Sequence, residues 1–299
     1  METGFRLRQS CPLCQAETHK TLCELPYSEP SMASFLKNFY QDRIPRQALH
    51  EESYRVVSCN RCDFIYQDRI LDANGMQALY QDWIDSAQSL RKKQTAKASL
   101  FRQYAGQIQT LMRLLPGDPA QIRVLEYGMG WGYWSRMAQA HGLDVSGYEL
   151  ASERREYARA MGVKVIDELP PQGAHFECLY ANQVFEHLPD PVANLQELCS
   201  RLTPGGLAYI RVPDGRGIAE RLRRHGWSPE LDAIHPLEHI NCFTRKTLID
   251  MALRAGLRPL SPPLRLNWGS LLNGLKREIA DRYQTTHVIF SRESEPHLL

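Results

Sequence analysis

Alternating patterns of apolar and polar residues divide the second half of the chain into strands and helices of moderate length. Short runs rich in Val, Ile, Leu and Tyr predict strands, and longer segments with apolar residues three or four positions apart predict helices. In chain order these are a strand at 122–127, a helix at 133–140, a strand at 144–149, a helix at 152–161, strands at 163–166 and 176–181, a helix at 191–202 and a strand at 206–212. Strands that alternate with helices indicate an α/β fold with a doubly wound, mainly parallel sheet.

The flanking regions predict a different organisation. Residues 86–115 contain no proline and space their apolar positions as a helix does, so we expect one long linking helix with a basic first half. Residues 64–84 predict a strand end, a turn at Asn74 and Gly75, and a short amphipathic helix. Residues 261–292 predict a helix inserted before a final strand. We therefore expect an N-terminal module at 1–85, the linking helix at 86–118 and an α/β domain at 119–299.

Composition and charge limit the class of protein. Of 299 residues, 43% are hydrophobic and 23% are charged, which is typical of a globular chain. The net charge of +2 gives no overall attraction to nucleic acid or to an anionic membrane. No run of eighteen apolar residues occurs, and the first residues lack the apolar core of a secretory signal. We expect a cytoplasmic protein with no membrane partner.

Four of the eight cysteines stand in two pairs of metal-ligand spacing. Cys11 and Cys14 form one C-x-x-C pair, and Cys59 and Cys62 form the other. This spacing directs two thiolates at one tetrahedral ion, and in a cytoplasmic chain thiols and metal ligands are expected rather than disulfides. We interpret the four residues as ligands of one structural Zn²⁺, with the intervening stretch looping out as an insertion. Four unrelated thiols are the alternative.

The stretch "VLEYGMGWGYWS" at residues 124–135 joins the first predicted strand to the first predicted helix. Gly128, Gly130 and Gly132 allow a tight turn and a close approach of the backbone to a ligand, while the helix start offers free N–H groups. A dinucleotide fingerprint requires its third glycine at position 133, where this chain has Tyr133, so an NAD-dependent oxidoreductase is disfavoured. Glu126 would repel a pyrophosphate and suits the amino group of a methionine tail instead.

Five segments, taken together, resemble a known family. They are "VLEYGMGWG", "VSGYEL", "FECLYANQVFEHLPDP", "LTPGGLAYIRVPDG" and "HPLEHINCFT", which span roughly residues 121–256. The chain resembles the class I S-adenosylmethionine-dependent methyltransferases, particularly bacterial small-molecule members with an N-terminal cysteine-rich zinc module. The resemblance implies a seven-stranded Rossmann-like sheet, a small zinc-ribbon-like module and S-adenosylmethionine as cofactor. It also implies that Glu126, Gly128 and Gly130 face the methionine part, Glu149 the ribose, Asp167 with Glu168 the adenine edge, and Asn182 the cofactor from the end of the fourth strand.

Three histidines are candidates for a catalytic base. A sulfonium methyl group is already a strong electrophile, so its transfer needs a nucleophile that is well placed and free of its proton. His187 follows the fourth strand of the α/β pattern, and His235 and His239 follow the fifth. We favour His239 as the base. A histidine that fixes a loop through a backbone hydrogen bond is the alternative, and a metal pair formed by His235 and His239 is disfavoured by Pro236.

Arginines gather after the fifth strand, and they suggest the kind of acceptor. They are Arg211, Arg216, Arg221, Arg223 and Arg224. Guanidinium groups suit phosphate or carboxylate, so we expect a small anionic metabolite or a sugar-type acceptor; a solvated helix face is the alternative reading. An RNA methyltransferase with a zinc module and a non-catalytic methyltransferase-like interaction protein remain as rival classes. Nucleic acid is disfavoured by the low net charge and by "ANQVFEH" at the end of the fourth strand, which lacks the clamp used on base amines.

Overall fold

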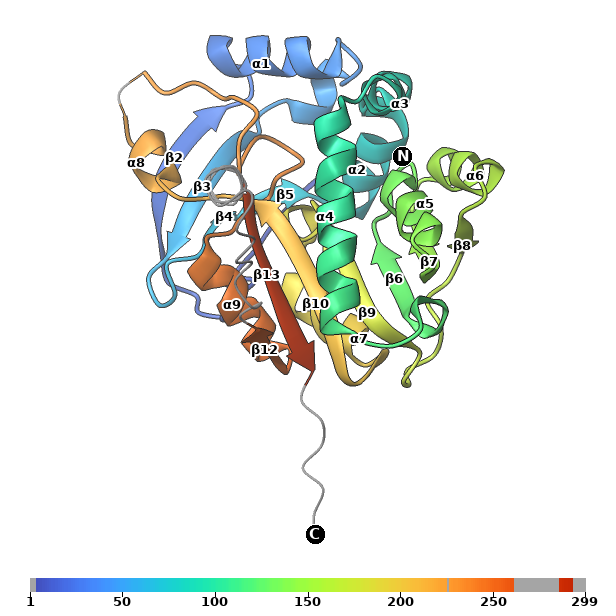
Figure 1. Cartoon of the computed structure of the whole chain (residues 1–299). Helices are drawn as coiled ribbons and strands as arrows, with labels where there is room; N and C mark the ends of the chain where they lie inside the picture. Colours follow the sequence, from blue (N-terminus) through green and yellow to red (C-terminus); the bar gives the residue numbers. More distant parts are fainter. Residues whose placement is uncertain (1–3, 225, 261–284, 293–299) are drawn as a thin grey trace, which may run out of the picture. The chain divides into compact units, whose positions relative to one another are not determined.

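The chain divides into two compact units that alternate along the sequence. A computed structural model describes residues 4–224, 226–260 and 285–292 (Figure 1). Unit 1 comprises Met1–Ser86, Phe185–Pro191 and Val212–Leu248, and unit 2 comprises Ala87–Val184, Val192–Arg211 and Ile249–Leu299. Two segments that the sequence analysis placed within the domain 119–299 thus belong to the unit of the N-terminal module. The region predicted as a separate linking helix belongs almost entirely to unit 2.

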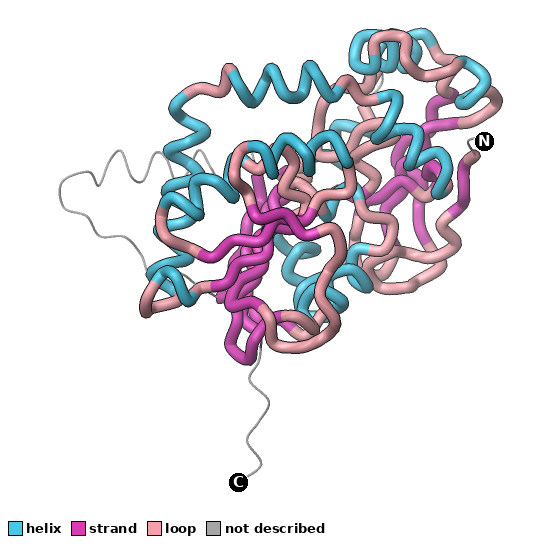
Figure 2. The backbone as a smooth tube through the Cα atoms, turned by 90° about the vertical axis from the view of Figure 1, so that its right-hand side faces the viewer, coloured by secondary structure: helices cyan, strands magenta, loops and turns pink. Residues whose placement is uncertain are grey.

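Unit 2 is built on a mixed, mostly parallel sheet of seven strands, whose order is β12-β13-β10-β9-β6-β7-β8. The strands are β6 (Arg123–Tyr127), β7 (Asp144–Tyr148), β8 (Lys164–Ile166), β9 (Phe176–Asn182), β10 (Leu202–Pro213), β12 (Leu257–Leu260) and β13 (Thr285–Arg292). Strands β6 to β10 pair in parallel, and β12 pairs with β13 antiparallel. Figure 2 shows strands of this sheet lying side by side. The predicted α/β fold is confirmed.

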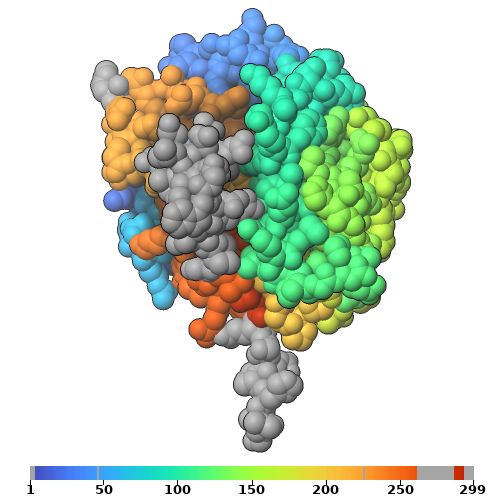
Figure 3. Space-filling model, viewed as in Figure 1, coloured from blue at the N-terminus to red at the C-terminus, as the bar shows by residue number. Residues whose placement is uncertain are grey.

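Helices α4 and α5 lie in front of the sheet in Figure 1 and bury its apolar surface. The helices that run partly or wholly in unit 2 are α3 (Ser86–Gln94), α4 (Ala98–Leu114), α5 (Tyr133–Ala140), α6 (Ser152–Ala160), α7 (Pro191–Cys199) and α9 (Arg245–Arg254), with a short 3-10 turn at Pro119–Gln121. Ile108 and Leu111 of α4 pack with Trp134 of α5 and Val124 of β6 in one core. Figure 3 shows α4 at the surface of unit 2, and Arg102 of this helix is exposed.

The prediction of one continuous helix at 86–115 is wrong, because this region forms two helices, α3 and α4. Thr95 directly follows α3, and its hydroxyl donates to the carbonyl of Arg91 at 2.8 Å. Lys97 is extended, with φ −70° and ψ 153°, and stands before the first residue of α4. The apolar periodicity starts only at Leu100, so α3 has no buried residue whose packing would keep it continuous with α4.

Unit 1 contains an antiparallel sheet of four strands in the order β11-β4-β3-β2 and a two-stranded pair of β1 and β5. The strands are β1 (Phe5–Leu7), β2 (His19–Pro26), β3 (Ser53–Cys59), β4 (Ile65–Gln67), β5 (Arg69–Leu71) and β11 (Asn241–Cys242). The helices are α1 (Pro30–Tyr40), α2 (Ala73–Ala78) and α8 (Ile218–Leu222), with helical turns at Arg46–Leu49, Leu79–Trp83 and Phe185–His187. Residues from early and late segments, such as Tyr54 and Ile234, share one apolar core.

Three expectations about peripheral segments have different outcomes. The predicted turn at Asn74 and Gly75 is wrong, because both residues lie in α2, whose N-cap Asp72 accepts a hydrogen bond from Gly75 N at 2.8 Å. The final strand is confirmed as β13, and the helix expected before it falls at 261–284, outside the described residues. Among the described helices, none combines the length and the apolar character that a membrane crossing requires.

Candidate functional site

The glycine turn follows β6 in unit 2 and has a left-handed backbone at all three glycines. Their φ values are 72° at Gly128, 55° at Gly130 and 72° at Gly132. A Cβ at Gly128 would lie 2.6 Å from Val184 Cγ2, and one at Gly132 would lie 3.0 Å from the Ala158 side chain. A Cβ at Gly130 would meet no atom within 4 Å. Gly128 and Gly132 are therefore required by packing, whereas Gly130 faces space that a ligand can fill.

Glu149 follows β7 and holds this turn in place. Its Oε2 accepts a hydrogen bond from Gly130 N at 2.9 Å, and its Oε1 accepts one from Ala151 N at 3.0 Å. A carboxylate has about four acceptor positions, so each oxygen can accept another hydrogen bond, for example from a ribose hydroxyl. The structure thus brings together two residues that the sequence analysis assigned to one cofactor.

Glu126, the acid before the glycines, is 5% exposed at the end of β6. Burial raises the pKa of its carboxyl group to about 8, although hydrogen bonds from Ser135 and the charge of Lys93 oppose this shift. The Ser135 hydroxyl donates to Glu126 Oε2 from the first turn of α5. A positive charge beside this carboxyl group would favour its ionised form. The site therefore suits a ligand with an ammonium group.

Two basic side chains of unit 2, Lys93 and Arg211, are held by hydrogen bonds to neighbouring side chains. Lys93 donates to Tyr104 Oη at 3.3 Å, and burial lowers the pKa of its ammonium group. Arg211, at the end of β10, donates to Asn182 Oδ1 at 3.4 Å. Lys93 belongs to the basic first half of the predicted helix, and its side chain is partly buried and bonded to Tyr104. The apolar periodicity begins at Leu100, after the break between α3 and α4. It therefore could not show that the side chain of Lys93 is partly buried.

Asp167 lies directly after β8, where the adenine edge was expected. It is exposed and bound to α6, with Arg159 Nη2 at 2.6 Å and Arg155 Nε at 3.3 Å from its carboxylate oxygens. The hydrogen bond from Arg159 lowers the pKa of Asp167. Its role at an adenine, with the neighbouring Glu168, stays a prediction.

In unit 1 the two cysteine pairs meet. The Sγ atoms of Cys11, Cys14, Cys59 and Cys62 all lie within 4.8 Å of one another. The Cys11–Cys62 distance is 3.7 Å and the Cys14–Cys59 distance is 3.5 Å. Four thiolates at about 2.3 Å from a tetrahedral ion stand about 3.8 Å apart, so this spacing fits Zn²⁺ closely. The residues between the pairs form β2, α1 and β3, and the antiparallel pairing of β2 with β3 brings the two pairs together.

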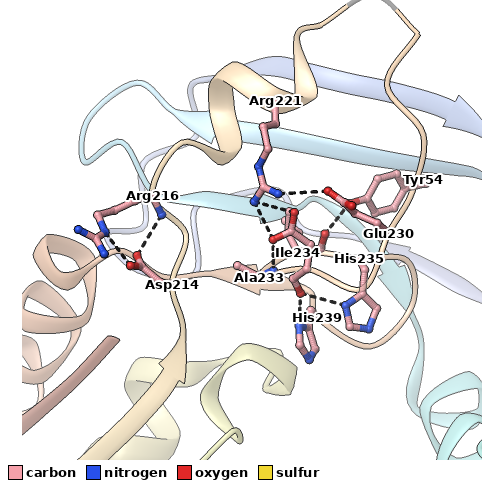
Figure 4. A network of polar contacts seen from close by, with 10 residues as sticks. Tyr54, Asp214, Arg216, Arg221, Glu230, Ala233, Ile234, His235 and His239 are labelled. Atoms are coloured by element: carbon pink, nitrogen blue, oxygen red, sulfur yellow. Dashed lines mark hydrogen bonds and ion pairs between the residues drawn. The ribbon is translucent and has the colours of Figure 1, made fainter. Parts of the chain in front are cut away.

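The three predicted histidines form a cluster in unit 1, and Figure 4 shows two of them, His235 and His239. His235 and His239 both donate from Nδ1 to the Asp232 carbonyl, at 3.1 Å and 2.7 Å. His187 donates from Nδ1 to the Glu238 carbonyl at 3.0 Å. Burial lowers the pKa of His235 to about 4 and that of His239 well below its usual value. His235 and His239 are therefore neutral at pH 7. All three imidazoles are anchored to the backbone, and a base role for His239 stays a prediction.

The arginines chosen as anion ligands in unit 1 are bound to acids. Arg216 Nε lies 2.6 Å from Asp214 Oδ2, and Arg221 lies 3.1 Å from Glu230 and 2.7 Å from Asp232 (Figure 4). Of these arginines, Arg216, Arg223 and Arg224 are exposed. Neutralised guanidinium groups attract an anion weakly, so Arg211 in unit 2 is a better candidate than Arg216 or Arg221.

Comparisons with known proteins show which family the chain is similar to. The family model described as "Methyltransferase domain" matches residues 97–261, which is more than half of the chain. The ubiquinone biosynthesis O-methyltransferase of Xanthomonas axonopodis pv. citri is 32% identical over 104 residues, covering 31% of this chain and 44% of that protein. The biotin biosynthesis bifunctional protein BioHC of Cellvibrio japonicus is 25% identical over 159 residues, covering 50% and 30%. The chain thus spans less than half of either relative. A crystal structure of an S-adenosylmethionine-dependent methyltransferase from Mesorhizobium loti has a TM-score of 0.44 at 19% identity, covering 61% of this chain and 96% of that one.

Proposed function

The chain belongs to the methyltransferase domain family, and on that premise we propose that it transfers a methyl group from S-adenosylmethionine to a small anionic acceptor. The observation that carries the proposal is the geometry at Gly130. Its backbone N–H is bound by Glu149, and the side-chain position is open. A ligand that approaches the backbone closely beside an acid accounts for both features.

The groups around the turn match the parts of the cofactor. The ammonium group of its methionine part suits Glu126, and the carboxylate of the same part suits the Lys93 ammonium, which influences the Glu126 carboxyl in unit 2. Glu149 retains acceptor positions for ribose hydroxyls. When bound, the cofactor supplies an electrophilic methyl group. The protein then has to position the acceptor, exclude water and take up a proton where the acceptor is a hydroxyl, for which His239 is the predicted base.

We further propose that the four-cysteine cluster holds one structural Zn²⁺. Four thiolates complete a tetrahedron and leave no open position for water or substrate. The spacing of the Sγ atoms supports this assignment.

Two observations support the choice of acceptor. Arg211 stands at the end of β10, and parallel sheets of this kind bind ligands beyond the carboxyl ends of their strands. Arg211 also bonds to Asn182, a residue predicted to contact the cofactor, so an anion held by Arg211 would lie near it. The relatives named as ubiquinone biosynthesis O-methyltransferases favour oxygen as the attacked atom.

Thermal melting tests the cofactor. S-Adenosylmethionine at saturating concentration should raise the melting midpoint, because a ligand that binds only the native state stabilises it, while NAD should leave the midpoint unchanged. A shift with NAD alone would refute the assignment.

Kinetics with matched carboxylate and neutral acceptors test the proposal that the acceptor is a small anion. Arg211→Ala should raise KM for the anionic acceptor by about tenfold or more, as expected for a lost charge-assisted hydrogen bond. Replacing the exposed Arg223 in the same way is the control and should change KM little. Equal use of anionic and neutral acceptors by both variants would contradict an anionic acceptor.

A further inference from the structure

A second group of metal-ligating side chains lies in unit 1, apart from the cysteines. Glu186, His187 and His239 each offer a ligand atom, and these three atoms lie within 4.8 Å of one another. Glu186 and His187 belong to the helical turn that follows β9 in the chain, and His239 comes from the loop before β11. Two segments about fifty residues apart therefore supply the ligands.

Backbone hydrogen bonds fix the orientation and the tautomer of both imidazoles. A carbonyl oxygen can only accept, so Nδ1 of His187 carries its proton towards Glu238, and Nδ1 of His239 carries its proton towards Asp232. In the neutral ring the lone pair then lies on Nε2. His187 Nε2 is 3.8 Å from Glu186 Oε1. Metal-bound histidines are typically held in this way, by a second hydrogen bond from the nitrogen that does not bind the metal.

The carboxylate of this group is fully buried. Glu186 is 0% exposed, and a carboxylate removed from water is costly unless a strong positive partner compensates it. A divalent ion is a strong positive partner of this kind for a buried carboxylate. His235 adds another polar atom, because its buried Nε2 has no hydrogen-bond partner among the described residues and its ring centroid lies 3.9 Å from that of His239.

Side chains of unit 1 hold both segments rigidly. Gln67 Nε2 donates to the carbonyls of His235 and His239, at 2.8 Å and 2.9 Å. Asn241 Nδ2 donates to the carbonyls of Phe185 and Leu188, at 2.9 Å and 2.7 Å. Both amides are almost completely buried, so each fixes one of the two segments independently of solvent. Such preorganisation is needed for a metal site, where ligands must stand within about 0.5 Å of their final geometry.

We propose that Glu186, His187 and His239 bind one divalent transition-metal ion through the carboxylate and the two Nε2 atoms. Two imidazoles and one carboxylate form a ligand set that suits Zn²⁺ and leaves a fourth position open for water or an oxygen ligand. Ligands at about 2.0–2.2 Å from a tetrahedral ion stand about 3.4 Å apart, so the pair at 3.8 Å needs only a small adjustment. The site goes beyond the proposed methyl transfer, and metal binding would occupy the nitrogen that a base role for His239 requires.

Metal content and cobalt titration test the site on the full chain, purified without chelator. The bound zinc found by elemental analysis and the Co²⁺ taken up in calorimetry should together reach about two equivalents per chain. Co²⁺ at the new site should give d–d absorption without the thiolate charge-transfer band that cysteine ligands produce. A total of one equivalent, all of it with thiolate character, would overturn the proposal and leave the histidines to a base role.

Substitutions of the proposed ligands test where the second equivalent of metal ion binds. His239→Ala and His187→Ala should each lower the total to about one equivalent and keep the cysteine-bound ion, and Glu186→Gln should weaken Co²⁺ binding by tenfold or more. His50→Ala, which removes an exposed histidine, should keep both equivalents. Because His187→Ala removes a side chain without touching the loop of His239, it provides a result if His239→Ala does not fold. Unchanged Co²⁺ binding in His187→Ala and Glu186→Gln would refute the assignment. Neither readout depends on methyl transfer.

Discussion

Glu126 shows how a single buried acid can be adjusted to its ligand. In the folded protein without ligand the carboxyl is favoured in its neutral form, because burial raises its pKa to about 8. The nearby Ser135 hydroxyl and the Lys93 charge moderate the shift, so the group remains able to ionise close to neutral pH. An approaching ammonium group therefore displaces a proton and creates its own counter-charge.

We predict that cofactor binding releases protons through Glu126. Between about pH 6 and pH 7.5 the carboxyl must lose its proton on binding, so affinity should rise with pH by about tenfold per unit. Calorimetry in two buffers of different ionisation enthalpy measures the release directly. Glu126→Gln should bind more weakly and release no proton by this route.

Replacing Glu126 should change stability in the opposite direction from cofactor affinity, which provides a control. A carboxyl whose folded pKa is raised contributes stability at low pH, and this contribution is lost between its unfolded pKa of about 4.5 and its folded value of about 8. Glu126→Gln should therefore raise the melting midpoint of the ligand-free protein at pH 8 while it weakens binding. A variant that melts at the wild-type midpoint and releases the same number of protons would contradict the assignment of the pKa to Glu126.

We predict that two glycines of the turn differ in what they contribute. Gly128→Ala and Gly130→Ala both place a side chain in left-handed backbone, at a cost of about 1–2 kcal/mol. Only the first also clashes with Val184, so Gly128→Ala should show the lower melting midpoint. Only the second fills open space, so Gly130→Ala should reduce cofactor affinity by tenfold or more with a smaller loss of stability. Equal affinity in both variants, measured by calorimetry, would show that Gly130 does not face the ligand.

At the scale of elements, the local sequence pattern predicts a strand or helix correctly where its structure depends mainly on its own residues. Val124 and Leu125 predict β6 because a strand buried on both faces is apolar throughout, and α5 begins at Tyr133 as expected from the turn before it. The break between α3 and α4 was missed because Thr95 and Lys97 are compatible with a helix in isolation. The two-residue strand β11 carries no periodicity, and only its pairing with Ile65 and Tyr66 defines it.

The candidate site was predictable to a similar extent. The glycines, Glu126 and Glu149 are adjacent to strand ends, so sequence order places them at one edge of the sheet. The partners of Arg221 were not predictable, since Glu230 and Asp232 reach it across a loop. The histidine cluster depends likewise on Asp232 and Glu238 carbonyls, and backbone groups leave no signal in a sequence.

We predict that the four-cysteine cluster, by holding Zn²⁺, determines the stability of the sheet formed by β2, β3 and β4. Cys59 ends β3, and Cys23 lies in β2 outside the cluster. Cys59→Ser should lose zinc and destabilise this sheet, because structural zinc contributes about 10 kcal/mol or more to folding. Cys23→Ser should retain both zinc and stability. Elemental analysis and hydrogen exchange of β2 and β3 measure the two effects, and unchanged protection in Cys59→Ser would argue against a structural metal.

The whole molecule is interleaved rather than divided in sequence order. The chain leaves one unit for the other after Ser86, Val184, Pro191, Arg211 and Leu248. Unit 1 therefore depends on chain that follows β9 and β10, and its core joins early and late residues. Hydrophobic periodicity reports which face of an element is buried, and it does not report against which distant segment the face packs. For this reason the boundary expected at residue 119 could not indicate the composition of either unit.

We predict that a chain beginning at Ala87 will not behave as an independent methyltransferase domain. The late segments of unit 1 carry Ile218, Leu222, Ile234 and Leu237, all buried against residues that come before Ser86 in the sequence. Without those partners the four side chains are exposed to water, and large exposed apolar patches lead to aggregation. The shortened chain should therefore be largely insoluble, or should bind hydrophobic dyes and melt below the full chain. Replacing Ile218 and Leu222 together by Ser should partly restore its solubility, because the exposed apolar area becomes smaller. A soluble shortened chain with the full-length melting midpoint and unchanged cofactor affinity would show instead that unit 2 folds without the N-terminal part of unit 1.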